Sequence, residues 1–137
     1  MSKNYGTLQD KNGNSLIPNA MEVVTNTNGT ALKFPDGTMI CYGEKNISCE
    51  ITKTLGSVYY GYVDNIAVYP VAFINDALVF FTHHTTGDVF AIQPYGYEKN
   101  INAGHNRKQY TGGVYPICGI TGTQNFYVTW LAIGRWK

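Results

Sequence analysis

Charged side chains are scarce in this 137-residue chain, where Asp, Glu, Lys and Arg together make up 14% of the residues, well below the usual quarter. Ten basic residues against nine acidic ones leave a net charge of +1, which excludes a broadly basic nucleic-acid-binding surface. No apolar run approaches the roughly 18 residues of a membrane-spanning helix. Residues 1–6 lack the basic-then-apolar pattern of a signal peptide. We therefore expect no nucleic-acid partner, no membrane insertion and no export signal.

Metal-ligand patterns are also missing. Cys41, Cys49 and Cys118 are odd in number, form no C-x-x-C spacing and have no histidine at ligand spacing. We expect three reduced, buried thiols, because free cysteine behaves as a small hydrophobic residue. His83 and His84 are adjacent, and adjacent residues of a strand point to opposite faces, so one chain cannot place both on one ion. We predict no metal and no cofactor. The alternative left open is a metal ion bound on a trimer axis by three copies of one of these histidines.

Catalytic signatures are absent as well. The carboxylates Asp36, Asp64, Asp76, Asp88 and Glu98 raise the possibility of a glycosidase, which needs two carboxyl groups about 5–10 Å apart. However, Asp36 and Asp76 lie in turn sequences, where such a side chain caps its own backbone. No G-x-S-x-G segment supports a serine esterase. We therefore predict that the protein is not an enzyme and has no catalytic residues.

The residues that are abundant favour β-structure. Hydrophobic residues make up 44% of the chain, enough for one core, and 11 Tyr with 15 Gly suit strands joined by tight turns. The Pro35-Asp36-Gly37 sequence predicts a hairpin turn, and no ten-residue stretch has helical apolar spacing. Strands are expected at 31–34, 38–43, 66–69, 71–74, 77–82, 88–92, 114–118 and 126–133. This pattern predicts an all-β fold, an antiparallel β-sandwich.

Two parts of the chain have a particular place in this fold. Residues 126–133 are apolar on both faces, so we expect a central strand covered on both sides, with Trp130 buried. Residues 1–30 contain Asn- and Gly-rich turn sequences at 10–14 and 26–30, with Pro18 between them, which indicate an extended N-terminal arm over residues 1–27. Residues 28–137 then form the β-sandwich domain.

Three segments carry a resemblance to a known family: Leu32-Lys-Phe-Pro-Asp-Gly-Thr-Met-Ile-Cys41, Tyr69-Pro-Val-Ala-Phe73 and Trp130-Leu-Ala-Ile-Gly-Arg-Trp-Lys137. In this order, and with a connecting segment at 8–14, the chain resembles the C-terminal receptor-binding module of bacteriophage and prophage tail-fibre proteins. These modules are similar to H-type lectin domains. The resemblance implies a six-stranded antiparallel sandwich that forms a homotrimer in the virion tail, after synthesis in the bacterial cytoplasm. It also implies binding to a host cell-surface glycan, with other tail or baseplate proteins as partners.

The segment 94–110 has the side chains that sugar recognition uses, namely aromatic faces and planar hydrogen-bonding groups. No family pattern aligns between Thr85 and Gly113, so these residues are assigned from their chemistry alone. The candidate ligand-binding residues are Tyr95, Tyr97, Asn102, His105, Asn106, Arg107 and Tyr110. The basic cluster 105–108 suits acidic groups of a bacterial surface polymer. The alternative is a polar loop whose tyrosines pack against the edge of the sheet.

A second function stays open beside the lectin-like one. The chain would then be a structural trimerisation or capping module that ends the fibre and binds no ligand. Val58-Tyr-Tyr-Gly-Tyr62 and the two tryptophans, Trp130 and Trp136, belong either to the subunit interface or to the core, and the sequence does not assign them between the two.

Overall fold

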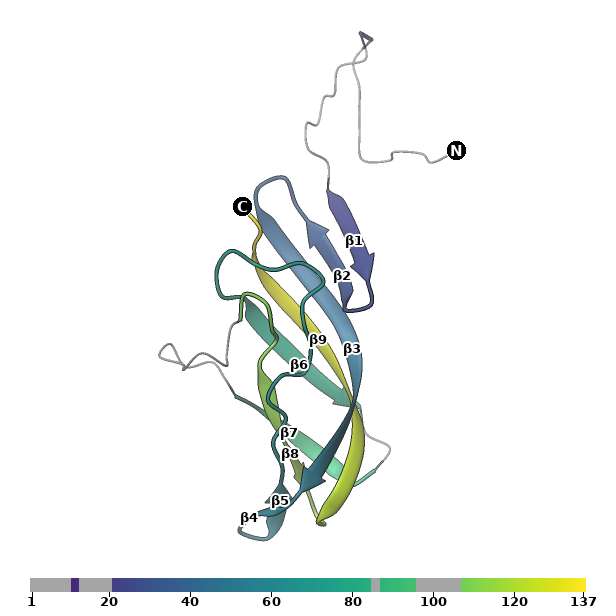
Figure 1. Ribbon diagram of the computed structural model, residues 1–137, viewed down its shortest axis with the longest axis vertical. Helices are drawn as coiled ribbons and strands as arrows, with labels where there is room; N and C mark the ends of the chain where they lie inside the picture. The colour runs from purple at the N-terminus through teal and green to yellow at the C-terminus, as the bar shows by residue number, and fades with distance from the viewer. Residues whose placement is uncertain (1–10, 13–20, 85–86, 96–106) are drawn as a thin grey trace.

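The computed structural model describes residues 11–12, 21–84, 87–95 and 107–137, and in these ranges the chain is all-β, with nine strands in two antiparallel sheets (Figure 1). The strands are β1 (Glu22–Asn26), β2 (Gly29–Lys33), β3 (Thr38–Ile51), β4 (Lys53–Leu55), β5 (Val58–Tyr60), β6 (Leu78–His84), β7 (Val89–Tyr95), β8 (Gly113–Cys118) and β9 (Gly122–Arg135). One sheet has the order β1-β2-β3-β9-β6, and the other has the order β4-β5-β8-β7. The prediction of an antiparallel β-sandwich is confirmed, with more strands than the six that the resemblance implies.

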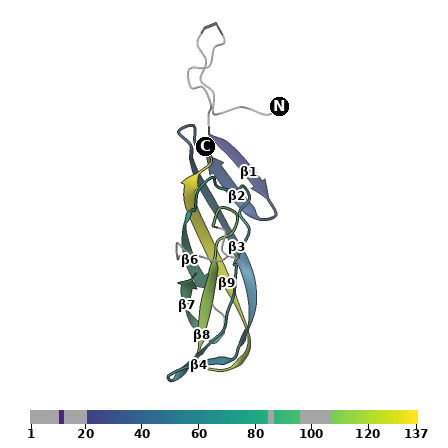
Figure 2. The ribbon, with the colours of Figure 1, turned by 60° about the vertical axis from the view of Figure 1, so that its left-hand side comes forward.

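The two sheets differ in length. The five-stranded sheet runs along the molecule, and the four-stranded sheet lies at the end where β4 and β5 are found (Figures 1 and 2). Between β5 and β6, residues 61–77 return along the molecule toward its other end, and Ile66, Tyr69, Phe73 and Ala77 of this segment are buried in the core. In the ranges that are described, no helix is long and apolar enough to cross a membrane.

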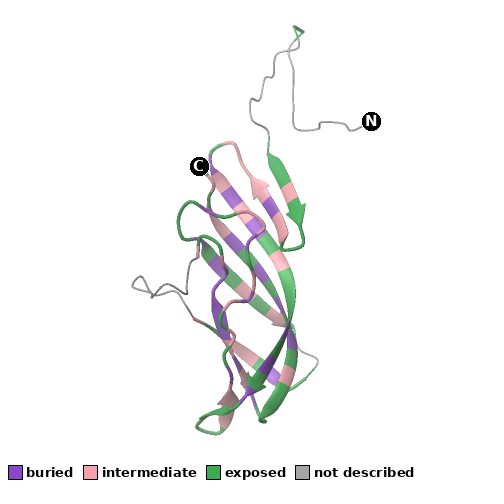
Figure 3. Cartoon of the chain, in the orientation of Figure 1, coloured by how far each residue is buried: buried purple, intermediate pink, exposed green. Residues whose placement is uncertain are grey.

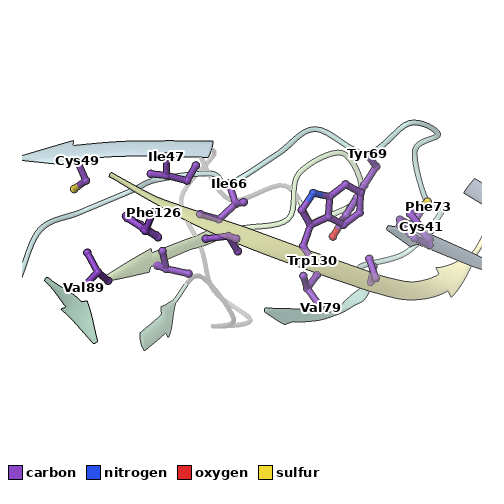
Figure 4. Close-up of a cluster of buried hydrophobic side chains, with 14 of the residues drawn as sticks. Cys41, Ile47, Cys49, Ile66, Tyr69, Phe73, Val79, Val89, Phe126 and Trp130 are labelled. Atoms are coloured by element: carbon purple, nitrogen blue, oxygen red, sulfur yellow. The ribbon is translucent and has the colours of Figure 1, made fainter. Parts of the chain in front are cut away.

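The core lies on one face of the long sheet. Along β9, Phe126, Val128, Trp130 and Ala132 are buried, while the residues between them are at least partly exposed (Figure 3). This alternation is what a strand produces when one face meets the core and the other faces solvent. The indole ring of Trp130 packs against the Tyr69 ring, with 5.7 Å between their centroids (Figure 4).

Two of the predicted turns, at 26–30 and 35–37, form tight hairpins. Between β2 and β3, the amide of Gly37 donates to the carbonyl oxygen of Phe34 and the amide of Thr38 donates to the side chain of Asp36. Gly37 has a φ of 96°, which a residue with a side chain rarely adopts. Between β1 and β2, the Asn26 side chain accepts a hydrogen bond from the amide of Asn28. Asx side chains cap the backbone in both turns, as their sequences indicate.

The predicted strands at 66–69 and 71–74 are wrong. The structure has an irregular segment there, with isolated bridges only at Val63 and Val68. Pro70 lies between the two apolar runs and has no amide to donate to a ladder. The other buried amides are satisfied by a neighbouring segment: those of Tyr69 and Phe73 donate to the carbonyl oxygens of Gln109 and Lys108. Apolar residues therefore cover the core there without a sheet.

Two further expectations need correction. Residues 22–26, assigned to the N-terminal arm, form β1 and pair with β2, so the sheet begins before residue 28; residues 1–10 and 13–20 of that arm lie outside the described residues. The strand at 126–133 is central, between β3 and β6, but it is covered on one side only. Tyr127 and Leu131 are 48% and 37% exposed on its other side.

The three cysteines are free and buried, as predicted. Cys41 lies in β3, within the core, and burial raises the pKa of its thiol to about 12. Burial also raises the pKa values of Cys49 and Cys118. None of the three is in a setting that activates a thiolate.

Replacement of Trp130 by Ala should lower the free energy of unfolding by about 3–5 kcal/mol, because it removes the largest buried side chain of the core. Urea denaturation of the wild type and of Trp130→Ala measures this difference. A loss below about 1 kcal/mol would contradict the central position of Trp130.

The thiols should not react with a disulfide reagent such as DTNB in mildly alkaline buffer while the protein is folded, because the thiolate is the reactive form and burial disfavours it. All three thiols should react once the protein is unfolded in guanidinium chloride. Rapid reaction of Cys41 in the folded state would contradict its burial.

Candidate ligand-binding site

A depression on the outer face of the four-stranded sheet has an aromatic lining. It has a volume of about 250 Å³ and is lined by Leu55, Tyr60, Tyr62, Gln93, Tyr115 and Ile117. This volume is slightly below that of pockets for drug-sized ligands. The depression therefore suits a small unit, such as one sugar ring of a longer polymer.

The strand register explains how these residues meet. Lys53 of β4, Tyr60 of β5 and Ile117 of β8 form one row across the sheet, and Gln93 of β7 lies opposite Tyr115 of β8 in the next. The alternate residues on β8 point inward, and Pro116 and Cys118 are both buried. The pleat thus turns the tyrosines away from the core.

Three tyrosine rings meet edge to face at the depression. The centroids of Tyr62 and Tyr115 are 5.1 Å apart, and Tyr60 lies 5.7 Å from Tyr62 and 5.9 Å from Tyr115. Edge-to-face contacts at such distances are favourable for aromatic pairs. They fix the ring orientations before a ligand arrives, which lowers the ordering cost of binding.

Tyr95 supports this cluster from the end of β7. Its ring stacks on that of Tyr115 with 4.4 Å between centroids and 25° between planes. Its hydroxyl donates to the Asp64 carboxylate at 2.8 Å. Burial, followed by this hydrogen bond, raises the pKa of Tyr95 well above its ordinary value. A Cβ at Gly113 would come within 2.6 Å of the Tyr95 ring, so a glycine opposite Tyr95 leaves room for the ring.

The depression also carries polar groups. The Lys53 ammonium lies 6.0 Å from the centroid of the Tyr62 ring, and the Gln93 side chain adds a planar amide. A hydrogen bond with Tyr62 raises the pKa of Tyr60, so this hydroxyl stays protonated at neutral pH and can donate or accept. Aromatic faces beside an amide, hydroxyls and one cation can hold the apolar face and the hydroxyl groups of a sugar.

The structure separates the residues that the sequence analysis grouped as one site. Tyr95 belongs to the tyrosine cluster. The Arg107 guanidinium lies 3.4 Å from the Asp76 carboxylate, and the backbone carbonyl oxygen of Arg107 accepts from the amide of Ala77. Arg107 therefore holds the segment before β6. Tyr110 lines a second depression; Tyr97, Asn102, His105 and Asn106 lie outside the described residues.

This second depression has a volume of about 270 Å³ and a more polar lining. It lies between the turn of β1 and β2, the middle of β3 and the segment 65–68, and its lining is Thr27, Asn28, Glu44, Lys45, Asn65, Ile66, Ala67, Val68 and Tyr110. Of the described residues that line it, Tyr110 alone is aromatic. It therefore lacks the ring cluster that makes the first depression suited to a sugar.

Tyr60, Tyr62 and Tyr115 are candidate site residues that the sequence alone does not indicate. The sequence leaves the segment 58–62 open between interface and core, and the structure divides it: Tyr59 packs against the core, while Tyr60 and Tyr62 line the depression. Tyr60 and Tyr62 are two residues apart, a spacing that suits one face of a strand. The contribution of Tyr115 depends on the pairing of β5 with β8 and has no signal along the chain.

Histidine placement follows the sequence prediction. His83 shares the row of Val128, and His84 shares the row of Tyr127, so the two lie on opposite faces of the sheet. In the part of the chain that the structure describes, no three His, Cys, Asp or Glu residues are grouped so that they could hold a metal ion.

Comparisons with protein-family models, curated protein sequences and solved structures give no match for this chain. We therefore infer the function from the geometry of the tyrosine cluster and from the resemblance of the three sequence segments.

Replacement of Tyr95 by Phe should lower the free energy of unfolding by about 1 kcal/mol at neutral pH, because it removes the hydrogen bond to Asp64. The raised pKa of Tyr95 in the folded state means that its contribution is present below pH 10 and is lost as the pH rises further. The difference between wild type and Tyr95→Phe should therefore shrink above about pH 10. Urea melts at neutral and alkaline pH test this; a constant difference would contradict it.

Proposed function

We propose that this chain is the receptor-binding tip domain of a phage or prophage tail fibre, and that it binds a carbohydrate on the bacterial surface as a homotrimer. The observation that supports carbohydrate binding is the depression lined by Tyr60, Tyr62 and Tyr115 on the outer face of the four-stranded sheet. The resemblance of the sequence to tail-fibre modules supports the place of the domain in a virion tail.

The segments that carry the resemblance lie together in the fold. The Trp136 indole donates to the carbonyl oxygen of Phe34 at 2.9 Å, and the Tyr69 ring packs on Trp130. The three segments lie toward the end of the molecule away from β4 and β5 (Figure 1). A shared framework at one end, with the ligand-binding face elsewhere, is consistent with a module that keeps its fold while its receptor contacts differ.

A sugar fits the depression better than a charged or wholly apolar ligand does. Among the residues that the structure describes, the lining contains no carboxylate, and the cation Lys53 lies 6.0 Å from the centroid of the Tyr62 ring. Three tyrosine hydroxyls and the Gln93 amide offer hydrogen bonds next to the aromatic faces. An apolar ligand would separate these groups from water and offer them no new hydrogen bond, which is unfavourable.

The alternative is a structural trimerisation or capping module that binds no ligand. The exposed apolar side of β9 and its neighbours favours a role in assembly. Assembly and sugar binding use opposite sheets and are compatible, so the two functions are distinguished by binding to cells and not by oligomeric state.

Replacement of Tyr62 or Tyr115 by Ala should weaken binding by about tenfold or more, because each ring supplies an aromatic contact face. The measurement is binding of fluorescently labelled protein to a panel of intact Gram-positive and Gram-negative bacteria, with free monosaccharides as competitors. Phe90→Ala is the matched control: Phe90 is 56% exposed, close to the 50% of Tyr62, and it lies on the same sheet outside the depression.

Each result has a defined meaning. Strain-selective binding that one sugar abolishes, and that Tyr62→Ala loses while Phe90→Ala keeps it, supports the proposal. Tyr62→Ala and Tyr115→Ala could both bind as the wild type does, while the double replacement of Asn102 and Asn106 by Ala abolishes binding. In that case the ligand contacts lie in the segment 96–106. Absence of binding to every strain by folded protein would favour the capping module.

A further inference from the structure

The outer face of the five-stranded sheet carries two adjacent rows of uncharged, mostly apolar side chains. The strand registers give one residue per strand in each row. From β1 to β6, the first row is Val23, Leu32, Ile40, Ile133 and Leu78, and the second is Thr25, Thr30, Tyr42, Leu131 and Phe80. We call these ten residues the outer apolar face.

Several of these side chains are well exposed. Leu78 is 64% exposed, Phe80 56%, Val23 54% and Tyr42 44%. With about 150–250 Å² for a full large side chain, the eight apolar and aromatic residues expose roughly 600 Å². That area is at the upper end of the largest apolar patches on monomeric proteins, and larger patches mark interaction sites.

Within the described ranges of the chain, few charged residues flank the outer apolar face. Neither row contains an Asp, Glu, Lys, Arg or His residue. Beyond the first row lies Arg135, paired with Thr38, and beyond the second lies Glu44, paired with Thr129. Copies of this chain can therefore meet through the two rows without burying an ionised group, which would be costly.

We propose that the outer apolar face is the interface between copies of this chain, and this inference locates the contact that the proposed homotrimer requires. A stable interface buries about 800 Å² on each partner. The two rows and the threonines Thr82 and Thr129 beside them approach this area and give the apolar centre and polar rim of such an interface.

The position of the interface suits the proposed binding site. The outer apolar face and the tyrosine depression are the outer faces of different sheets, with the core between them. Association through the first leaves the second open to solvent in every copy. Several depressions on one assembly increase avidity for a repeating surface polymer without any new contact.

The test is the oligomeric state of the full chain, measured by light scattering after size exclusion and by analytical ultracentrifugation. Wild-type protein should have the mass of two or more 15.2 kDa monomers. Phe80→Asp should weaken self-association by at least about 30-fold, because it places a charge within the apolar interface. Phe90→Asp is the matched control, since Phe90 is also 56% exposed but lies on the other sheet.

Hydroxyl-radical footprinting of wild-type protein keeps the test decisive if Phe80→Asp fails to fold. Tyr42, Phe80 and Leu131 should be protected relative to Leu55 and Phe90. A monomeric wild type, labelling of the outer apolar face in the assembly, or loss of assembly in Phe90→Asp alone would overturn the inference.

The outcomes separate this inference from the proposed function. A dimer or trimer that Phe80→Asp disrupts supports the interface, and a dimer would contradict only the proposed number of subunits. An assembly that binds no bacterial strain would leave the interface intact and contradict the carbohydrate-binding function. A monomeric wild type that binds cells in a sugar-dependent way would contradict the interface and the homotrimer and leave the carbohydrate-binding function intact.

Discussion

The pairing of β3 with β9 is the interaction on which the rest of this structure depends. The two strands are antiparallel partners over fourteen residue pairs, from Thr38 with Arg135 to Ile51 with Gly122. The register of this ladder determines which face of both strands points inward, because a shift of one residue would turn every side chain to the opposite face. Gly43 lies opposite Trp130 in the ladder, and a Cβ there would come within 2.9 Å of the indole. The register and the packing of the largest core residue are therefore tied together.

An irregular segment completes the core that this ladder begins. The four-stranded sheet covers only one end of the long sheet (Figure 1), and over the rest, residues 61–77 place Tyr69 and Phe73 against the core. The carbonyl oxygens of residues 107–109 accept the amides of this segment, so the backbone is satisfied without a strand. Arg107, expected to contact a ligand, is part of this structural support.

The two outer faces of the sandwich have different chemistry. The outer face of the four-stranded sheet gathers tyrosine rings around polar groups, while that of the five-stranded sheet carries two uncharged, largely apolar rows. Both lie outside the core and neither is needed to form it. An assembly through the apolar rows that leaves the tyrosines exposed would account for both faces in one molecule.

The sequence by itself determined the all-β class, the hairpin turn at Pro35-Asp36-Gly37, the buried thiols and the burial of Trp130, because each depends on local turn chemistry or on apolar composition. Its alternation pattern could not show which face of residues 126–133 lacks a cover, since both faces are apolar and only the positions of the second sheet and of residues 61–77 decide between them. Nor could it bring Tyr115 to Tyr62, 53 positions earlier in the numbering. Tertiary structure alone decided the candidate site, because its residues come from four separate parts of the chain, and strand pairing is what places them on one face.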